Sequence, residues 1–220
     1  DGGVILYNMK TSKFEAQPYI NSTFPQIDQV TALEIDKQNN LWIGTVEGVS
    51  VGTINDQNFK RYNFMDSLLI DRITALYCDP NGNMWIGTEP RGNKPGLIRY
   101  NATTKDFKKI SSLSGITPKS LVMDKAGLLW IGTSEGLKAI RNDSIVHIVK
   151  QEDGLLSNNI NLLAAGEDGS IYIGTNNGLN RYFPESERIF SYTERYGFSG
   201  IEAKPNAVYK SPGGDLWFGT

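Results

Sequence analysis

Short stretches in which apolar and polar residues alternate recur along the whole chain. Examples are "VTALEID" at 30–36, "ITALYCD" at 73–79 and "NAVYKS" at 206–211. Each is followed by a cluster of Asn, Asp or Gly, such as "PNGN" at 80–83 or "EDGS" at 167–170. Alternation with a period of two predicts a strand with one buried face, and these clusters predict tight hairpin turns.

An aromatic segment follows each turn and repeats five times. Its copies are "LWIGT" at 41–45, "MWIGT" at 84–88, "LWIGT" at 129–133, "IYIGT" at 171–175 and "LWFGT" at 216–220. A third strand is expected after a Gly-Leu pair, as in "GLIRY" at 96–100, and a fourth after it, as in "IVHIV" at 145–149. Units of about 40–45 residues with four strands are typical of propeller blades. The sequence therefore predicts an all-β fold, a β-propeller of four-stranded antiparallel blades with five repeats.

The repeats also suggest how the chain is divided. We expect one domain, 1–220, with blades at approximately 26–68, 69–113, 114–155 and 156–198, and a fifth at 199–220 that is completed by 1–25. The segment "GVILYN" at 3–8 has the pattern of a third strand, and the chain ends on the motif threonine, Thr220. One blade is thus expected to be shared between the N- and C-termini. Two alternatives stay open: a closed five-blade ring, or five blades of a larger ring.

The aromatic and glycine of each motif are predicted to be architectural. A large ring can fill the space between neighbouring sheets, and the glycine removes a side chain where the sheets crowd together. The residues concerned are Trp42, Gly44, Trp85, Gly87, Trp130, Gly132, Tyr172, Gly174, Trp217 and Gly219.

Composition narrows the function. The net charge is −2, which gives no electrostatic reason to expect nucleic acid as a partner. Cys78 and His147 are single residues of their kinds, so an internal disulfide and a His-rich metal site are excluded. "DPNGN" at 79–83 lacks the longer ligand run of a calcium loop and is interpreted as a hairpin turn. We predict no catalytic residue, no metal and no cofactor.

The repeat "D-x-x-G-x-L-W-I-G-T-x-x-G-L-x-R-Y", legible at 79–100, 124–140 and 168–182, resembles the two-component regulator propeller repeat. "DGLLSNNI" at 153–160 looks like that family's lead-in to a blade, and 196–220 is similar to its late blades. The resemblance implies the extracytoplasmic, periplasmic sensor region of histidine kinases and hybrid two-component systems of Bacteroidetes-type bacteria. Such regions precede an Ig-like domain, a membrane helix and a kinase, and often respond to oligosaccharides. This chain holds fewer repeats than those sensors commonly carry, and none of the downstream parts.

Strand direction places the loops after each "GT" and the loops between blades on one face, the top face, where a rigid scaffold would present binding residues. The clearest irregularity there is the insertion "EPRGNKP" at 89–95. Amide, carboxylate and guanidinium groups on this face suit hydroxyl-rich or anionic sugars. The candidate ligand-binding residues are Arg91, Lys94, Asp71, Arg72, Lys119, Asn158, Asn159, Glu202, Lys204 and Asn206.

Three hypotheses follow. The first is a non-catalytic sensor propeller of a two-component receptor that recognises an oligosaccharide or a partner domain on its top face. The second is a scaffold that holds a homodimeric kinase in register through contacts with neighbouring propeller and Ig-like domains. The third is a propeller lyase or hydrolase, which would need acid and base groups clustered in the central channel.

Overall fold

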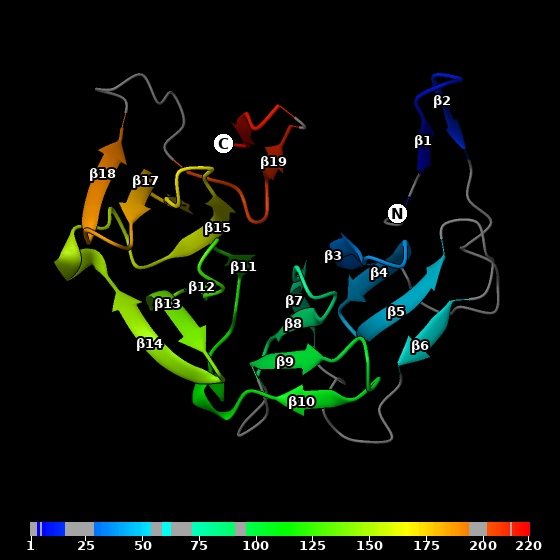
Figure 1. Ribbon diagram of the computed structural model, residues 1–220. Helices are drawn as coiled ribbons and strands as arrows, with labels where there is room; N and C mark the ends of the chain where they lie inside the picture. The colour runs from blue at the N-terminus through cyan, green and yellow to red at the C-terminus, as the bar shows by residue number, and fades with distance from the viewer. Residues whose placement is uncertain are drawn as a thin grey trace.

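The computed structural model of the chain is all-β. It describes residues 4, 6–15, 29–53, 59–62, 72–90, 96–193, 202–211 and 213–220. Within these ranges, four antiparallel sheets have four strands each, and two have two strands. In every sheet the strands pair in chain order. Figure 1 shows the sheets side by side, with β3, β7, β11, β15 and β19 toward the middle and β6, β10, β14 and β18 at the outside.

The strands of the four complete sheets have the following bounds. The first sheet holds β3 (Val30–Ile35), β4 (Asn40–Thr45), β5 (Gly48–Thr53) and β6 (Lys60–Tyr62). The second holds β7 (Ile73–Cys78), β8 (Met84–Thr88), β9 (Leu97–Tyr100) and β10 (Phe107–Lys109). The third holds β11 (Ser120–Met123), β12 (Leu129–Thr133), β13 (Gly136–Arg141) and β14 (Ser144–Val149). The fourth holds β15 (Ile160–Ala165), β16 (Ile171–Thr175), β17 (Gly178–Phe183) and β18 (Arg188–Tyr192).

Two hairpins complete the described strands. β1 (Leu6–Asn8) pairs with β2 (Lys13–Glu15), and β19 (Val208–Lys210) pairs with β20 (Leu216–Phe218). The predicted all-β propeller is confirmed. The two hairpins lie where the two halves of the shared blade are expected, and their union into one blade stays a prediction. Within the described residues these hairpins form separate sheets. Short 3-10 helices, Ser111–Leu113 and Gln151–Asp153, lie in two of the connections between sheets.

Neighbouring sheets approach each other closely at two glycines of the aromatic motif, Gly44 and Gly132. A Cβ atom added to Gly44 would lie 2.6 Å from Cγ2 of Ile73, the first residue of β7. At Gly132 the same distance, 2.6 Å, would separate it from Cγ2 of Ile160, the first residue of β15. Contacts this short do not occur between real side chains, so any larger residue would push the sheets apart. The glycines therefore set the spacing between blades.

The motif tryptophans fill the space beside these glycines. Trp42, Trp85 and Trp130 are 2%, 6% and 0% exposed, and each packs against apolar residues of the next sheet. Tyr172 is only half-buried. The prediction of an inter-blade filler does not hold for Trp217, which is 66% exposed. Its side of β20 carries no packed sheet within the described part of the chain, so nothing covers the indole.

An aspartate six residues before each buried tryptophan fixes both the turn and the ring. Asp79 accepts hydrogen bonds from the backbone N–H groups of Asn81 (2.8 Å) and Asn83 (2.9 Å) and from Nε1 of Trp85 (3.0 Å). Nε1 of Trp42 and of Trp130 donates in the same way, to Asp36 (2.9 Å) and Asp124 (2.7 Å). The interpretation of "DPNGN" as a hairpin turn is confirmed, with Gly82 at φ +85° in the left-handed region.

We expect Asp79→Ala to lower the free energy of unfolding by about 2–4 kcal/mol, because buried donors would lose their acceptor. Asp79 is 2% exposed, so water cannot replace the carboxylate without rearrangement. Chemical denaturation measures the loss. Asp168→Ala is the matched control, because Asp168 lies at the corresponding turn of the fourth sheet but is exposed and bonds to Ser170 and Arg181. Equal losses for the two variants would contradict this explanation.

Glu34 lies between the first and second sheets. Burial raises its pKa from 4.5 to about 7, although hydrogen bonds from the backbone N–H groups of Ile35 and Cys78 lower it. The folded protein therefore holds this proton more tightly than the unfolded chain. The stability that this proton contributes is fully present below pH 4.5 and is lost as the pH rises through about 7.

We therefore expect Glu34→Gln to stabilise the protein at about pH 8, on the order of 1–2 kcal/mol, and to change its stability little at about pH 5. The amide keeps the shape of the side chain and cannot ionise. Thermal unfolding of variant and wild type at the two pH values measures this. An equal change in melting temperature at both would show that ionisation of Glu34 has no influence.

Candidate functional site

A cavity of about 450 Å³ lies among the inner strands, on the top face. Residues from all five repeat units line it. They are Val30, Thr31, Arg72, Ile73, Thr74, Glu89, Thr117, Lys119, Asn161, Pro205 and Asn206. This volume is within the usual range of small-molecule sites, and most of the lining side chains are polar. We call it the axial cavity.

A β-bulge directs a polar residue toward the cavity from three of the inner strands. The register of β3, β7 and β15 against their partners shifts by one residue at Thr31, Thr74 and Asn161. In each case the next residue lies opposite the motif glycine, as Ala32 lies opposite Gly44. Such a bulge leaves one residue out of the ladder and re-aims its side chain, which is common beside functional sites.

The other two units supply a residue at the same position. Lys119 precedes Ser120, the partner of Gly132, and its N–H donates to the carbonyl of Gly132 (2.7 Å). Asn206 precedes Ala207, whose carbonyl accepts from Gly219 (2.8 Å). We define the axial ring as these five residues: Thr31, Thr74, Lys119, Asn161 and Asn206.

Hydrogen bonds hold the axial ring together across the fold. Asn206 N–H donates to the carbonyl of Asn161 (3.1 Å), and its side-chain amide donates to the carbonyl of Thr74 (3.4 Å). Nδ2 of Asn161 donates to the carbonyl of Ala203 (2.9 Å). Nζ of Lys119 donates to Oδ1 of Asn159. The fifth unit is thus bonded to the second and the fourth, and these bonds connect Thr74, Asn161 and Asn206 of the axial ring.

The axial ring contains a buried hydroxyl that is unsatisfied within the described residues. Oγ1 of Thr31 is buried, and no hydrogen-bond partner for it lies among the residues that the structure describes. The corresponding hydroxyl of Thr74 donates to the carbonyl of Pro118. Buried hydroxyls normally have a partner, so the free one at Thr31 indicates where a water or ligand atom would bind.

Charged side chains stand at the rim. Arg72 and Glu89 are exposed there, and the N–H of Glu89 donates to the carbonyl of Arg72 (2.9 Å). Together with Lys119, the cavity presents two cations and one carboxylate beside hydroxyl and amide groups. This mixture can bind sugar hydroxyls and can pair with an anionic group.

The structure brings together part of the predicted binding set. Arg72, Lys119 and Asn206 line the axial cavity, and Asn159 adjoins it through its bond to Lys119. Glu202 and Lys204 instead pair with each other at 2.9 Å and do not line it. Arg91, Lys94 and Asp71 lie outside the described residues.

Asn158 has a structural task. Its Oδ1 accepts from the N–H of Gln151 (2.8 Å), and its carbonyl accepts from Gly136 (2.9 Å). These bonds hold the connection between β14 and β15. Asn158 is not among the residues that line the axial cavity, so the structure gives it no place in the candidate site.

Sequence reasoning missed Thr31, Thr74, Thr117, Asn161 and Glu89. Thr31, Thr74 and Asn161 could have been found from the sequence. Each axial-ring residue stands immediately before the strand position that faces the motif glycine. The alternation of "VTALEID" and "ITALYCD" hid it, since it counts Thr31 and Thr74 as ordinary strand residues.

The single histidine and cysteine lie elsewhere. His147 is on the outer strand β14, as predicted, with its ring 5.7 Å from that of Trp130. Cys78 is a half-buried free thiol whose pKa is raised by burial. Within the described residues, no group of three or more His, Cys, Asp and Glu could hold a metal ion. No helix in the same residues is long and apolar enough to span a membrane.

Comparisons with known proteins agree with the repeat. The family model of the two-component regulator propeller matches residues 26–47 and 67–89. No curated protein matches the sequence. Many solved structures do match, and they include extracellular domains of two-component systems and a lyase.

Two of these are extracellular domains from B. thetaiotaomicron. That of the hybrid two-component system BT3049 is 24% identical, with a TM-score of 0.75 over 91% of this chain and 27% of its own. That of BT4673, a one-component system, is 21% identical, with a TM-score of 0.78 over 99% of this chain and 29% of its own. This chain therefore spans less than a third of either domain.

An enzyme is similar at lower identity. Virginiamycin B lyase from Staphylococcus aureus is 16% identical, with a TM-score of 0.64 over 88% of this chain and 64% of its own. Likeness at these identities shows a common propeller fold, and the matched segments identify the repeat. Two segments of the chain, 26–47 and 67–89, match the two-component regulator propeller repeat.

Proposed function

We propose that this chain is a non-catalytic, ligand-binding sensor propeller of a two-component receptor, and that the axial cavity binds a hydroxyl-rich or anionic oligosaccharide. The observation that carries the proposal is the axial ring. Five repeat units each place one polar residue at the same strand position, and all five line a single cavity. A scaffold that served only architecture would not need polar side chains at every one of these positions.

The chemistry of the cavity supports a sugar. The hydroxyl of Thr31 is free to bond, the amides of Asn161 and Asn206 are held in place, and Arg72 and Lys119 supply positive charge. Pre-positioned amides and hydroxyls lower the entropic cost of binding a polar ligand. A loop of a partner domain with the same groups would fit the same chemistry and is the second occupant that the proposal admits.

The surrounding receptor is part of the same proposal. The two-component regulator propeller match and the extracellular domains with this fold support a location outside the cytoplasm, which we propose is periplasmic. Neighbouring propeller and Ig-like domains in a homodimeric receptor are part of the proposal as expected partners. Nucleic acid is not expected, since the net charge is −2.

We expect saturable binding when the chain is titrated calorimetrically with a panel of neutral and anionic oligosaccharides. Arg72→Ala and Lys119→Ala should each weaken binding of the best ligand about tenfold, because each removes a charged hydrogen-bond donor from the cavity. Arg188→Ala is the control, because Arg188 lies on the outer strand β18 and should leave binding unchanged.

Three results would contradict the proposal. Flat titrations across the whole panel would favour the scaffold, above all if the chain dimerises regardless of sugar. Equal weakening by Arg188→Ala would mean that binding is not at the axial cavity. Release of shortened or unsaturated products during incubation with polysaccharide would identify a lyase or hydrolase instead.

Thr31 allows a test that separates binding from folding. We expect Thr31→Val to leave the unliganded protein as stable as the wild type or about 0.5–1 kcal/mol more stable, because it removes a buried hydroxyl without a partner. The same variant should weaken sugar binding. Thr74→Val is the matched control and should be destabilising, because its hydroxyl bonds to Pro118. Thermal unfolding with and without sugar measures both effects. A destabilised Thr31→Val with unchanged sugar affinity would show that the hydroxyl serves the fold.

A further inference from the structure

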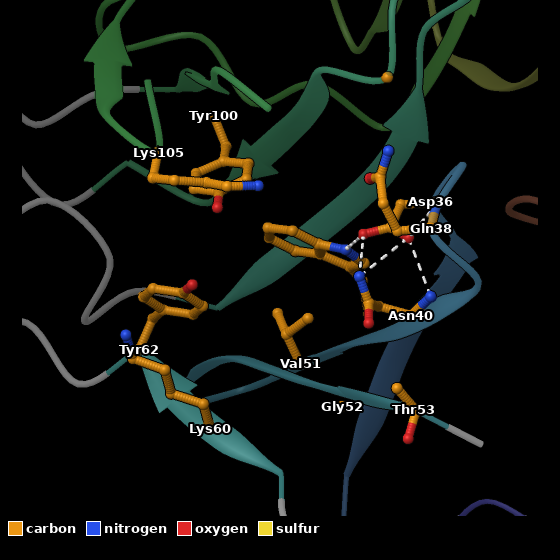
Figure 2. A pocket seen from close by; sticks show the side chains of 12 residues that line it. Asp36, Gln38, Asn40, Val51, Gly52, Thr53, Lys60, Tyr62, Tyr100 and Lys105 are labelled. Atoms are coloured by element: carbon orange, nitrogen blue, oxygen red, sulfur yellow. Dashed lines mark hydrogen bonds between the residues drawn. The ribbon is translucent and has the colours of Figure 1, made fainter. Parts of the chain in front are cut away.

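A second cavity lies between the first two complete sheets, on the face opposite the axial cavity. Its volume is about 280 Å³. The hairpin turns of both sheets surround it, and Figure 2 shows the side chains that line it. They belong to Asp36, Gln38, Asn40, Trp42, Val51, Gly52, Thr53, Lys60, Tyr62, Gly82, Tyr100 and Lys105. We call it the interblade groove.

Aromatic rings form one wall of the interblade groove. The ring of Trp42 lies 6.2 Å from that of Tyr62, nearly parallel to it, and 5.1 Å from that of Tyr100. Trp42 is almost fully buried, so the accessible part of this wall comes mainly from half-buried Tyr62. Burial, with a further contribution from Tyr62, raises the pKa of Tyr100 to about 12, so its phenol stays neutral.

Two lysines flank these rings. Nζ of Lys60 lies 4.8 Å from the centre of the Tyr62 ring, and Nζ of Lys105 lies 5.9 Å from that of Tyr100. Lys105 is in the left-handed conformation at φ +63°, and its N–H donates to the carbonyl of Asn101 (2.9 Å). Within the described part of the chain, neither ammonium group forms an ion pair.

The next junction between sheets is arranged differently. Lys108 occupies the place of Lys60, because each lies two strands across from a motif tryptophan. There Asp143 of the third sheet pairs with Lys108 (2.7 Å) and with Arg99 (3.7 Å). At the first junction Lys60 and Lys105 are present, but no acidic residue in the described part of the chain pairs with them as Asp143 does with Lys108.

The third junction also has a cavity at this level, of about 230 Å³, but of another character. His147 stands at the position of Lys60, and Pro184 and Glu185 replace the loop that carries Lys105. Of the junctions between complete sheets, only the first combines several aromatic rings with two lysines that lack an acidic partner in the described residues. The residues that line the first junction therefore differ from those at the equivalent positions of the other repeats, so the repeat alone does not explain them.

At the end of the interblade groove away from the lysines, Asp36 and Asn40 already form hydrogen bonds. Figure 2 shows Asp36, Gln38 and Asn40 on the side away from Lys60 and Lys105. Burial would raise the pKa of Asp36, but hydrogen bonds from Trp42 and Asn40 lower it below its ordinary value. The carboxylate is thus ionised but already bonded. Gln38 and Thr53 are exposed and offer an amide and a hydroxyl.

We propose that the interblade groove binds a single sugar ring that carries a carboxylate or sulfate group, with the anion between Lys60 and Lys105 and the ring against Tyr62. Lysine ammonium groups beside neutral aromatic rings attract an anion and leave an apolar surface for the C–H face of the ring. The hydroxyls would then face Gln38 and Thr53, and the anionic group would point away from Asp36. This site is additional to the axial cavity and does not depend on its function.

The experiment is a calorimetric and NMR titration of the full chain with glucuronate and with glucose 6-sulfate. We expect saturable binding of at least one of them, with a Kd on the order of 1 mM for so small a ligand, and weaker binding of neutral glucose. Lys60→Gln with Lys105→Gln should weaken binding of the anionic sugar at least tenfold. Lys108→Gln is the control, because Lys108 is already paired with Asp143, and it should have no effect.

Several outcomes would overturn the proposal. These are binding unchanged by the double variant, equal weakening by Lys108→Gln, and no saturable binding of either sugar. Acetate that competes as well as glucuronate would also overturn it, because it would mean that charge alone is recognised. Which of the two sugars binds more tightly assigns the anion as carboxylate or sulfate. Arg72→Ala should leave this binding unchanged, which separates it from the axial cavity.

Discussion

The close contact of the motif glycines Gly44 and Gly132 with the first strand of the next sheet is the constraint on which the rest of the structure depends. A methyl group at Gly44 or Gly132 would collide with Ile73 or Ile160. Because the sheets approach this closely, the buried tryptophans beside the glycines can fill the remaining space between blades. Their N–H groups would then be cut off from water, and the aspartates of the hairpin turns supply the acceptors. Spacing, filling and turn geometry are therefore one coupled arrangement.

The same contact creates the candidate site. The inner strand must bring one residue against the glycine, and the bulge before that residue leaves its neighbour out of the ladder. The displaced side chains meet in the axial cavity, since all inner strands run in the same direction. Architecture thus fixes where these residues lie and leaves their identity free. The fold does not require threonine, lysine or asparagine at these positions, and this is why we propose that these residues serve binding.

The sequence predicted the fold well because the repeat occurs five times. It also placed Arg72, Lys119 and Asn206 on the top face, where they line the axial cavity, because loop direction follows from strand direction. It missed Thr31, Thr74 and Asn161, since a bulge cannot be distinguished from regular alternation without the partner strand. The interblade groove was also out of reach, because Lys60 and Tyr100 belong to different repeats and meet only when the sheets pack. The exposure of Trp217 has the same origin: burial of a motif tryptophan depends on a neighbouring sheet, and the motif itself does not report one.

The axial ring is the part of the protein that we propose contacts the ligand. Side-chain amide NMR signals test it most directly, because Asn161 and Asn206 each carry one and both line the cavity. During titration with a binding oligosaccharide, we expect these two amide signals to shift and to saturate with the calorimetric affinity. If binding saturates while both amide signals stay unmoved and the shifts lie on outer strands such as β18, the ligand binds outside the axial cavity, which contradicts the proposed site.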